Sequence, residues 1–166
     1  VEWPEDLSVA AQNHAAIMLG TDIAQYFPNR SEELSAYLLW QKDQLERVDV
    51  SSLARGRNCA GLLYSRLEPI LSTHDALLCP TTLVNDVGAE QMPWELMSVN
   101  GANLNSDYDW VTTYAFNMLG QLPVLTVPVG RTANGIPVGL QVVAQSFDDL
   151  RAFRAAAFIE RVMQFT

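Results

Sequence analysis

A hairpin signal near the carboxyl end most strongly limits how this chain can fold. Two runs rich in β-branched and apolar residues, 123–129 and 138–144, flank Asn134-Gly135. Asn-Gly favours the tight turn between neighbouring antiparallel strands. Pro128 is expected at a sheet edge or a strand end, because proline cannot donate to a strand ladder. The pattern therefore predicts two adjacent antiparallel strands.

A last helix is expected directly after this hairpin. Residues 146–149 (Ser-Phe-Asp-Asp) resemble a capping box that opens such a helix. The helix is too apolar around its circumference to lie alone on solvent. Its apolar side chains on one face are Ala152, Ala156, Ile159 and Met163, with Phe158 and Val162 beside them.

The amino-terminal part of the chain predicts three helices, over 4–27, 31–48 and 51–71. Ser31 is the expected N-cap of the second helix, and Pro69 should kink or end the third. The apolar spacing in the first helix places Leu7, Ala11, His14 and Met18 on one stripe. In the third helix, the expected packing residues are Leu53, Ala60, Tyr64, Leu67 and Leu71.

The hydrophobic period changes after these helices. Residues 75–79 form a short apolar run ended by Pro80, which predicts a buried strand. Residues 81–109 lack clear periodicity, and a loop of that length in a compact domain is usually functional or partnered. A short helix is expected over 109–119. These segments predict a single α/β fragment over 1–166, helical in 1–73 and sheet-forming with a closing helix in 74–166.

A sheet of only the three predicted strands is small for the number of helices, which suggests that further strands come from a part of the protein outside this sequence. An opening on Val-Glu-Trp-Pro, without an initiator Met, fits a chain cut from something longer.

Charge and cysteine content limit the classes of partner. The net charge is −9 and no basic cluster occurs, so the electrostatic attraction that drives binding to nucleic acid or to an anionic membrane is missing. No apolar run reaches the roughly 18 residues of a membrane span. Cys59 and Cys79 occur in no metal-ligand spacing. We therefore expect a cytoplasmic protein without a metal.

The sequence offers few candidate catalytic side chains. His14 falls on an apolar helical face, where a hydrogen-bonded core role is favoured over a base. His74 precedes a strand and suits a turn. Lys42, the only lysine, lies among charged neighbours and shows no sign of the desolvation that a lysine base requires. Nucleophile-elbow, zinc-protease, phosphate-loop and dinucleotide fingerprints are all missing from the sequence.

Four segments, in the same order and at sensible spacing, resemble the amidase-signature family over residues 75–160. They are DALLCPTT at 75–82, NMLGQLP leading into TVPVG at 117–130, GIPVGLQ at 135–141, and the Ala-rich helix at 147–160. The first 74 residues are similar only in helical character and in an Arg-rich third helix. The chain is similar to the last third of such an enzyme.

The resemblance implies the carboxy-terminal part of a mixed-sheet α/β/α fold. It also implies an enzyme that hydrolyses a carboxamide C–N bond, giving a carboxylate and ammonia or an amine, with no cofactor. The family's Ser–cis-Ser–Lys triad lies in the amino-terminal half and has no counterpart here, because Ser51-Ser52 lacks the flanking glycines. No catalytic residue carries over, and the chain alone is expected to be inactive.

By this resemblance, the turn after Cys79 and the helix before Asn117 form a wall of the substrate pocket. The candidate substrate-binding residues are Thr81, Trp110, Thr113, Tyr114 and Asn117. Ordinary packing of an apolar helix on a sheet is the alternative for these residues. Met92, Trp94 and Met97 either supply an adaptable apolar lid or cover core. Gln141, in an apolar strand, must find hydrogen-bond partners and is expected to be structural rather than substrate-binding.

Two alternatives to the amidase fragment stay open. The chain is a non-catalytic subunit or binding module, or it is part of an amidotransferase A-type subunit. In the main interpretation its partner is a small amide substrate, bound together with the missing amino-terminal part. Self-association is also expected, because a domain cut through a sheet exposes a strand edge and apolar surface.

Overall fold

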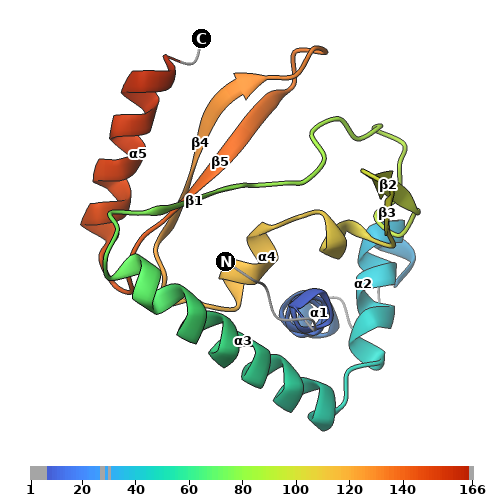
Figure 1. The fold of residues 1–166 in the computed structure, drawn as a ribbon. Coiled ribbons are helices and arrows are strands. Elements are labelled where there is room, and N and C mark those ends of the chain that lie inside the picture. The colour runs from blue at the N-terminus through green and yellow to red at the C-terminus, as the bar shows by residue number, and fades with distance from the viewer. Residues whose placement is uncertain (1–6, 27–28, 30, 165–166) are drawn as a thin grey trace. The chain divides into compact units, whose positions relative to one another are not determined.

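The structure is a computed structural model that describes residues 7–26, 29 and 31–164 (Figure 1). The described residues form two compact units, which divide between Leu63 and Tyr64. The division falls inside helix α3, Val50–Leu71.

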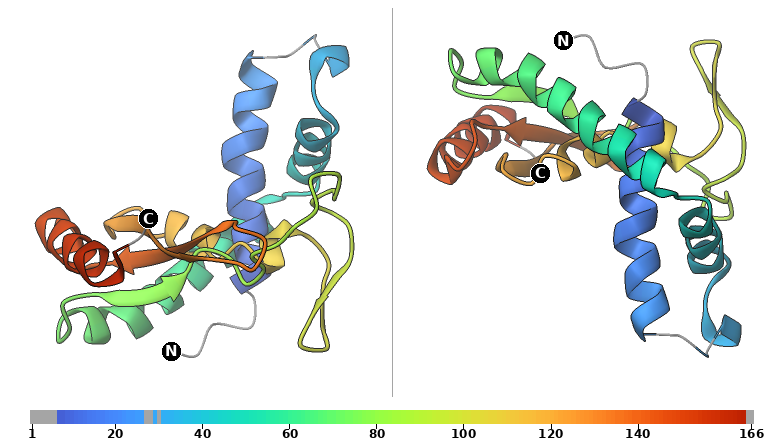
Figure 2. Two further views of the ribbon diagram at one scale, coloured as in Figure 1. Left: turned by 90° about the horizontal axis from the view of Figure 1, so that it is seen from above. Right: turned by 90° about the horizontal axis from the view of Figure 1, so that it is seen from below.

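The first unit is helical. It contains α1 (Leu7–Tyr26), the 3₁₀ turn η1 (Ser31–Glu33), α2 (Ala36–Glu46) and the first part of α3. Helices α1 and α2 lie side by side (Figure 2), and Gln12 Nε2 donates to Gln44 Oε1 across them at 3.0 Å. The three predicted helices are therefore present. Residues 4–6 and 27 of the predicted first helix lie outside the described residues.

Two details of these helices differ from the prediction. Met18 is exposed, and the buried face of α1 is made of the alanine pairs at 10–11 and 15–16. Small side chains let a neighbouring helix approach closely, which a simple apolar period does not reveal. Ser35, rather than Ser31, caps α2: its Oγ accepts from Leu38 N at 3.3 Å.

Helix α3 buries a stripe spaced by four residues, Cys59, Leu63, Leu67 and Leu71. Leu53, predicted to pack, is exposed. Pro69 sits in the last turn, and the helix continues to its end at Leu71. The hydroxyls of Ser72 and Thr73 donate to the Pro69 carbonyl and close this end of the helix.

The second unit contains an antiparallel sheet in the order β1-β5-β4. Strand β4 is Val124–Arg131 and β5 is Pro137–Val143, and the two pair around Asn134-Gly135 as predicted. Gly135 has φ 81°, the left-handed conformation that the turn requires. Pro128 lies at a bulge in β4, an edge strand of the described sheet, which confirms its expected edge position.

Strand β1, Leu77–Pro80, pairs with β5 on one side. The prediction of a buried strand is wrong for Leu78, whose side chain is 49% exposed. The reason is that β1 forms the other edge of the described sheet, so an apolar run is left partly uncovered.

Helix α5, Asp149–Met163, runs along β4 and β5 (Figure 1). Ala156 packs with Val127 and Val142 in the core of this unit. Asp148 caps the helix by accepting from Arg151 N at 3.0 Å. The capping box predicted from Ser146 is therefore wrong, and Ser146 Oγ instead hydrogen-bonds Tyr64 Oη at 3.0 Å.

The segment between β1 and β4 is more ordered than the sequence predicts. It contains a small hairpin of β2 (Met97–Val99) and β3 (Ala102–Leu104), with Asn100 and Gly101 both at positive φ. This is the same Asn-Gly signal that marks the main hairpin. The expected helix over 109–119 is replaced by the 3₁₀ turn η2 (Asp107–Asp109) and the short α4 (Thr113–Asn117). The described chain is thus mixed α/β.

Candidate functional site

The turn after β1 lies beside the segment that leads into α4. Thr82 and Val111 form an antiparallel bridge, Thr112 N donates to Thr81 O at 3.1 Å, and Leu83 N donates to Trp110 O at 2.8 Å. Segments 81–83 and 110–112, far apart in the sequence, are therefore held together by main-chain hydrogen bonds. Two of the predicted site residues, Thr81 and Trp110, belong to this short ladder.

The other predicted site residues belong to α4. Thr113 begins this helix and Asn117 ends it, four residues apart and so on one helical face. Asn117 is exposed. Tyr114 is held within the protein, since its hydroxyl donates to Asp107 Oδ2 at 3.3 Å and its ring lies 5.0 Å from that of Tyr108. Both the hydroxyl and the ring of Tyr114 therefore make contacts within the fold.

The buried side-chain amide of Gln141 hydrogen-bonds to residues next to this ladder. Gln141 is 1% exposed, and its Nε2 donates to Pro80 O at 3.0 Å and to Thr112 Oγ1 at 3.1 Å. Thr112 Oγ1 in turn donates to the same Pro80 carbonyl. These contacts connect β5, the end of β1 and the start of α4. The structural role predicted for Gln141 agrees with this arrangement.

Thr112 was not singled out from the sequence, although it connects Gln141 with Pro80 and Thr81. Its position between Val111 and Thr113 gives no local signal, because its role depends on a bridge across about thirty residues of chain. Gly139 also belongs to this region. Its carbonyl accepts from both the main-chain N and the Oγ1 of Thr81, each at 3.2 Å.

The electrostatics of the nearby thiol do not favour a nucleophile. Burial raises the pKa of Cys79 to about 11, although the Gln141 amide, 3.4 Å from its Sγ, acts in the opposite direction. A reactive cysteine needs a lowered pKa instead. The half-buried Cys79 thiol is therefore a packing group of β1 rather than a nucleophile.

Neither histidine is arranged as a catalytic base in the described structure. Burial lowers the pKa of His14, which stabilises its neutral form. His74 lies just past α3, with Nδ1 2.9 Å from Ile70 O and 3.0 Å from Thr73 Oγ1. These contacts place His74 in the turn that follows the helix, as expected from the sequence.

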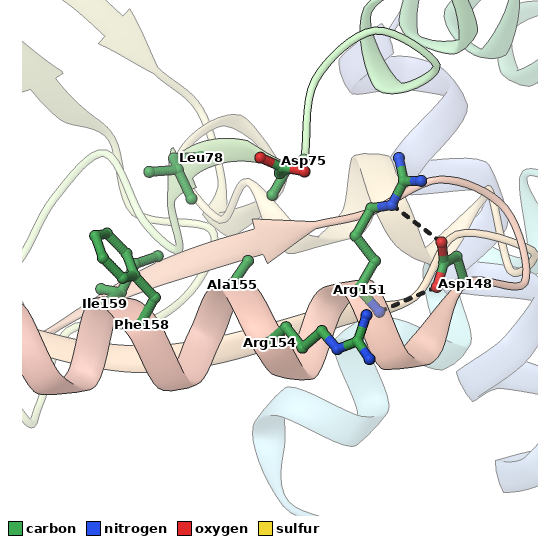
Figure 3. Close-up of a pocket in the computed structure, with 9 residues that line it drawn as sticks. Asp75, Leu78, Asp148, Arg151, Arg154, Ala155, Phe158 and Ile159 are labelled. Carbon is green, nitrogen blue, oxygen red and sulfur yellow. Dashed lines mark hydrogen bonds and ion pairs between the residues drawn. The ribbon is translucent and has the colours of Figure 1, made fainter.

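An open groove lies elsewhere, between β1 and α5 (Figure 3). Its volume is about 550 Å³. The lining residues include Ala76 and Leu78 from the β1 segment, and Ala155, Phe158 and Ile159 from α5. None of the five predicted substrate-binding residues lines this groove. Their contact with substrate therefore stays a prediction.

Metal-binding clusters and membrane-spanning helices are both missing from the described ranges. No group of three or more His, Cys, Asp or Glu side chains there has an arrangement able to hold a metal ion. No helix within those ranges combines the length and apolar character needed to cross a bilayer.

Comparison with known proteins gives a consistent result. The Amidase family profile matches residues 3–152. An acylamidase of Rhodococcus erythropolis is 32% identical over 137 residues, which covers 81% of this chain and 28% of that protein. The A-type subunit of the mitochondrial glutamyl-tRNA(Gln) amidotransferase of Bos taurus is 35% identical over 91 residues, covering 55% of this chain and 16% of that relative.

Solved structures show the same fold. A bacterial aryl acylamidase of the amidase signature family superposes with TM-score 0.74 at 21% identity, covering 95% of this chain and 34% of that structure. Another amidase superposes with TM-score 0.77 at 19% identity, covering 96% of this chain and 36% of that structure. The chain thus spans about a third of these proteins. Because the family profile matches residues 3–152, which is more than half of the chain, the chain belongs to the amidase family.

Proposed function

We propose that this chain forms the scaffold and one substrate-pocket wall of an amidase that hydrolyses a carboxamide C–N bond to a carboxylate and ammonia or an amine. The observation that carries the proposal is the hydrogen-bonded ladder between 81–83 and 110–112, supported by the buried Gln141. Main-chain bonds fix this ladder, so Thr81 and Trp110 are presented from a rigid base.

The catalytic groups are proposed to lie outside this chain. By the family resemblance, a Ser–cis-Ser–Lys triad attacks the amide carbonyl, and main-chain N–H groups stabilise the resulting oxyanion. Within the described residues, the chain offers a thiol of raised pKa and two histidines in packing or turn positions. These groups support a wall and scaffold role rather than a nucleophile and base.

The experiment measures release of nitroaniline from a chromogenic nitroanilide amide. We expect no turnover from the purified 166-residue chain. A chimera of the Rhodococcus acylamidase, in which its matched region is exchanged for this chain, should hydrolyse the substrate. Trp110→Ala in the chimera should raise KM, while Phe153→Ala, at an exposed position of α5, should not. Turnover by the isolated chain, abolished by one substitution within it, would sink the proposal.

An amidotransferase A-type subunit is the second candidate, favoured by the 91-residue similarity to the mitochondrial relative. Such an enzyme takes glutamine as its amide. The same chimera should be assayed for ammonia release from glutamine. Glutamine hydrolysis faster than nitroanilide hydrolysis would favour this second candidate.

A cytoplasmic location also belongs to the proposal. Cys59 and Cys79 are both free thiols, which fits a reducing compartment. Detection of the full protein in a cytosolic cell fraction is the corresponding measurement.

A further inference from the structure

The loop that follows the ladder is attached to the end of the β4–β5 hairpin by one carboxylate. Thr132 Oγ1 donates to Asp86 Oδ1 at 3.2 Å, and Asn134 Nδ2 donates to Asp86 Oδ2 at 3.1 Å. The two donors lie 46 and 48 residues further along the chain. Because each carboxylate oxygen has its own donor, the two bonds together fix the orientation of the Asp86 side chain as well as its position.

The hydrogen bonds of the hairpin turn leave Asp86 as the acceptor for the Thr132 hydroxyl. Thr132 Oγ1 accepts from Asn134 N at 3.3 Å and from Ile136 N at 3.2 Å. A hydroxyl has two lone pairs and one proton, so these bonds use its acceptor capacity and leave the proton to donate. The main chain of the turn is bonded as well, since Gly135 N donates to Thr132 O at 2.9 Å. The turn is therefore a firm point of attachment.

Asp86 is the point at which the 84–92 loop is held along its length. Figure 1 shows this segment leaving β1 and running toward β2. Within the described ranges, the hydrogen bonds that join residues 84–92 to other segments are the two made by Asp86. The bond from Gln91 N to Gly88 O, at 3.0 Å, is internal to the loop. Loss of the Asp86 carboxylate would therefore remove the hydrogen bonds that hold the middle of this loop.

Both ends of this loop are attached to the proposed pocket wall. Before it, Leu83 N donates to Trp110 O at 2.8 Å in the ladder. After it, Asp107 N donates to Pro93 O at 2.8 Å, and the Tyr114 hydroxyl donates to Asp107 Oδ2 at 3.3 Å. A change in the position of the loop therefore acts directly on the segments that position Trp110 and Tyr114.

The candidate lid residues lie at the second attachment. Met92 and Trp94 flank Pro93 and are 40% and 37% exposed. We propose that Asp86 is a positioning residue of the substrate pocket: by tying the 84–92 loop to the hairpin, it holds Met92 and Trp94 in place beside the wall. The inference rests on the proposed function and adds to it a residue that affects substrate binding without touching the substrate.

The test uses variants that remove, oppose and restore the attachment. Asp86→Ala removes both acceptor oxygens. Asn134→Asp places one carboxylate against another, and it keeps an Asp-Gly pair that suits the hairpin turn. The double variant Asp86→Asn with Asn134→Asp exchanges donor and acceptor, keeps an oxygen for the Thr132 hydroxyl and leaves the net charge unchanged. Asp86→Asn alone is less informative, because the Asn134 amide can turn to present its oxygen. Asn85→Ala, at the exposed neighbouring position, is the control.

The first measurement is the rate at which a glutamate-specific protease cleaves after Glu90 in the 166-residue chain, followed by mass spectrometry. The rate reports the fraction of molecules in which the loop is detached and open to the protease. Asp86→Ala and Asn134→Asp should each raise it about tenfold, the factor expected when exposed hydrogen bonds of modest net strength are lost. The double variant and Asn85→Ala should stay within about twofold of the unsubstituted chain.

The second measurement is KM and kcat for the nitroanilide in the acylamidase chimera. Asp86→Ala and Asn134→Asp should raise KM about threefold or more, with kcat changed by less than about twofold, because they weaken binding rather than the chemical step. The double variant should return KM to the value of the unsubstituted chimera. A merely structural defect would reduce the amount of active enzyme, which lowers the apparent kcat and leaves KM unchanged.

Two results would overturn the inference in an active chimera. One is a double variant that cleaves as fast, or binds as weakly, as Asn134→Asp alone. The other is a KM that stays constant although cleavage after Glu90 accelerates, since the carboxylate would then hold the loop without affecting the pocket. Failure of the proposed function is a separate observation, because it is seen in the unsubstituted chimera as the lack of any amide hydrolysis. The role of Asp86 in substrate binding would fall with it, whereas the cleavage rates would still report the attachment of the loop.

Discussion

At the residue scale, Cys79 offers a direct probe of the environment around the Gln141 network. Burial raises its pKa from 9.0 to about 11. The thiolate is the reactive form, so at pH 8 native Cys79 should react with iodoacetamide about a hundred times more slowly than an unfolded-chain thiol. The rate is measured by mass spectrometry in a Cys59→Ala variant, with and without denaturant.

Gln141→Leu supplies the matching comparison. The Gln141 amide lowers the Cys79 pKa, so its removal should slow the reaction further. The raised pKa also makes the free energy of unfolding depend on pH. The contribution of this thiol to that free energy is fully present below about pH 9 and is lost as the pH rises toward 11, because the native state resists forming the buried thiolate. A native alkylation rate equal to the unfolded rate would contradict the burial of the thiol.

Gln141 also shows how far single residues are predictable. The sequence indicates that an amide in an apolar strand needs partners. It does not indicate that the partners are Pro80 and Thr112, because both come from segments that only the tertiary fold brings together. For the same reason, the sequence gives no indication that the hydroxyl of Tyr114 donates to Asp107.

At the scale of elements, Gly139 sets how closely β5 approaches the turn after β1. A Cβ at this position would lie 2.8 Å from Thr81 Oγ1 and 3.1 Å from Thr126 Cγ2. Gly139→Ala should therefore destabilise the protein by ~1–3 kcal/mol through overpacking. The measurement is the free energy of unfolding in urea.

Gly130→Ala is the control, since a Cβ there meets nothing within 4 Å and the residue belongs to the same sheet. Thr81→Ala should rescue part of the loss in a double variant, because it removes the atoms that come closest to the new methyl group. If the two glycine substitutions cost the same, the close approach at Gly139 is not a determinant of stability.

Elements whose signals are local were predictable, and their ends were not. The β4–β5 hairpin follows from Asn134-Gly135 and its flanking β-branched residues. The predicted start of α2 was wrong because two residues, Ser31 and Ser35, offer the same capping chemistry. Which of them caps is decided by the path of the preceding chain, and that path is not local information.

At the scale of the whole molecule, the order of four short motifs was enough to identify the family and the α/β class. The groove between β1 and α5 was not predictable from sequence. An apolar strand is normally covered on both faces and edges, so the 75–79 run indicated a buried strand. The exposure of Leu78 depends instead on which strands lie beside it.

The exposed apolar surface and the net charge of −9 act in opposite directions on self-association of the isolated chain. Apolar side chains exposed on α5 and β1 favour association, whereas repulsion between acidic molecules opposes it. Salt shortens the Debye length from about 10 Å at 0.1 M to about 3 Å at 1 M. The mean mass in light scattering should therefore rise as NaCl is increased at pH 8. A mean mass that falls as NaCl is increased would indicate an ionic interface instead. A monomer at high protein concentration, at both low and high NaCl, would show that the uncovered edge and groove are too small to drive association.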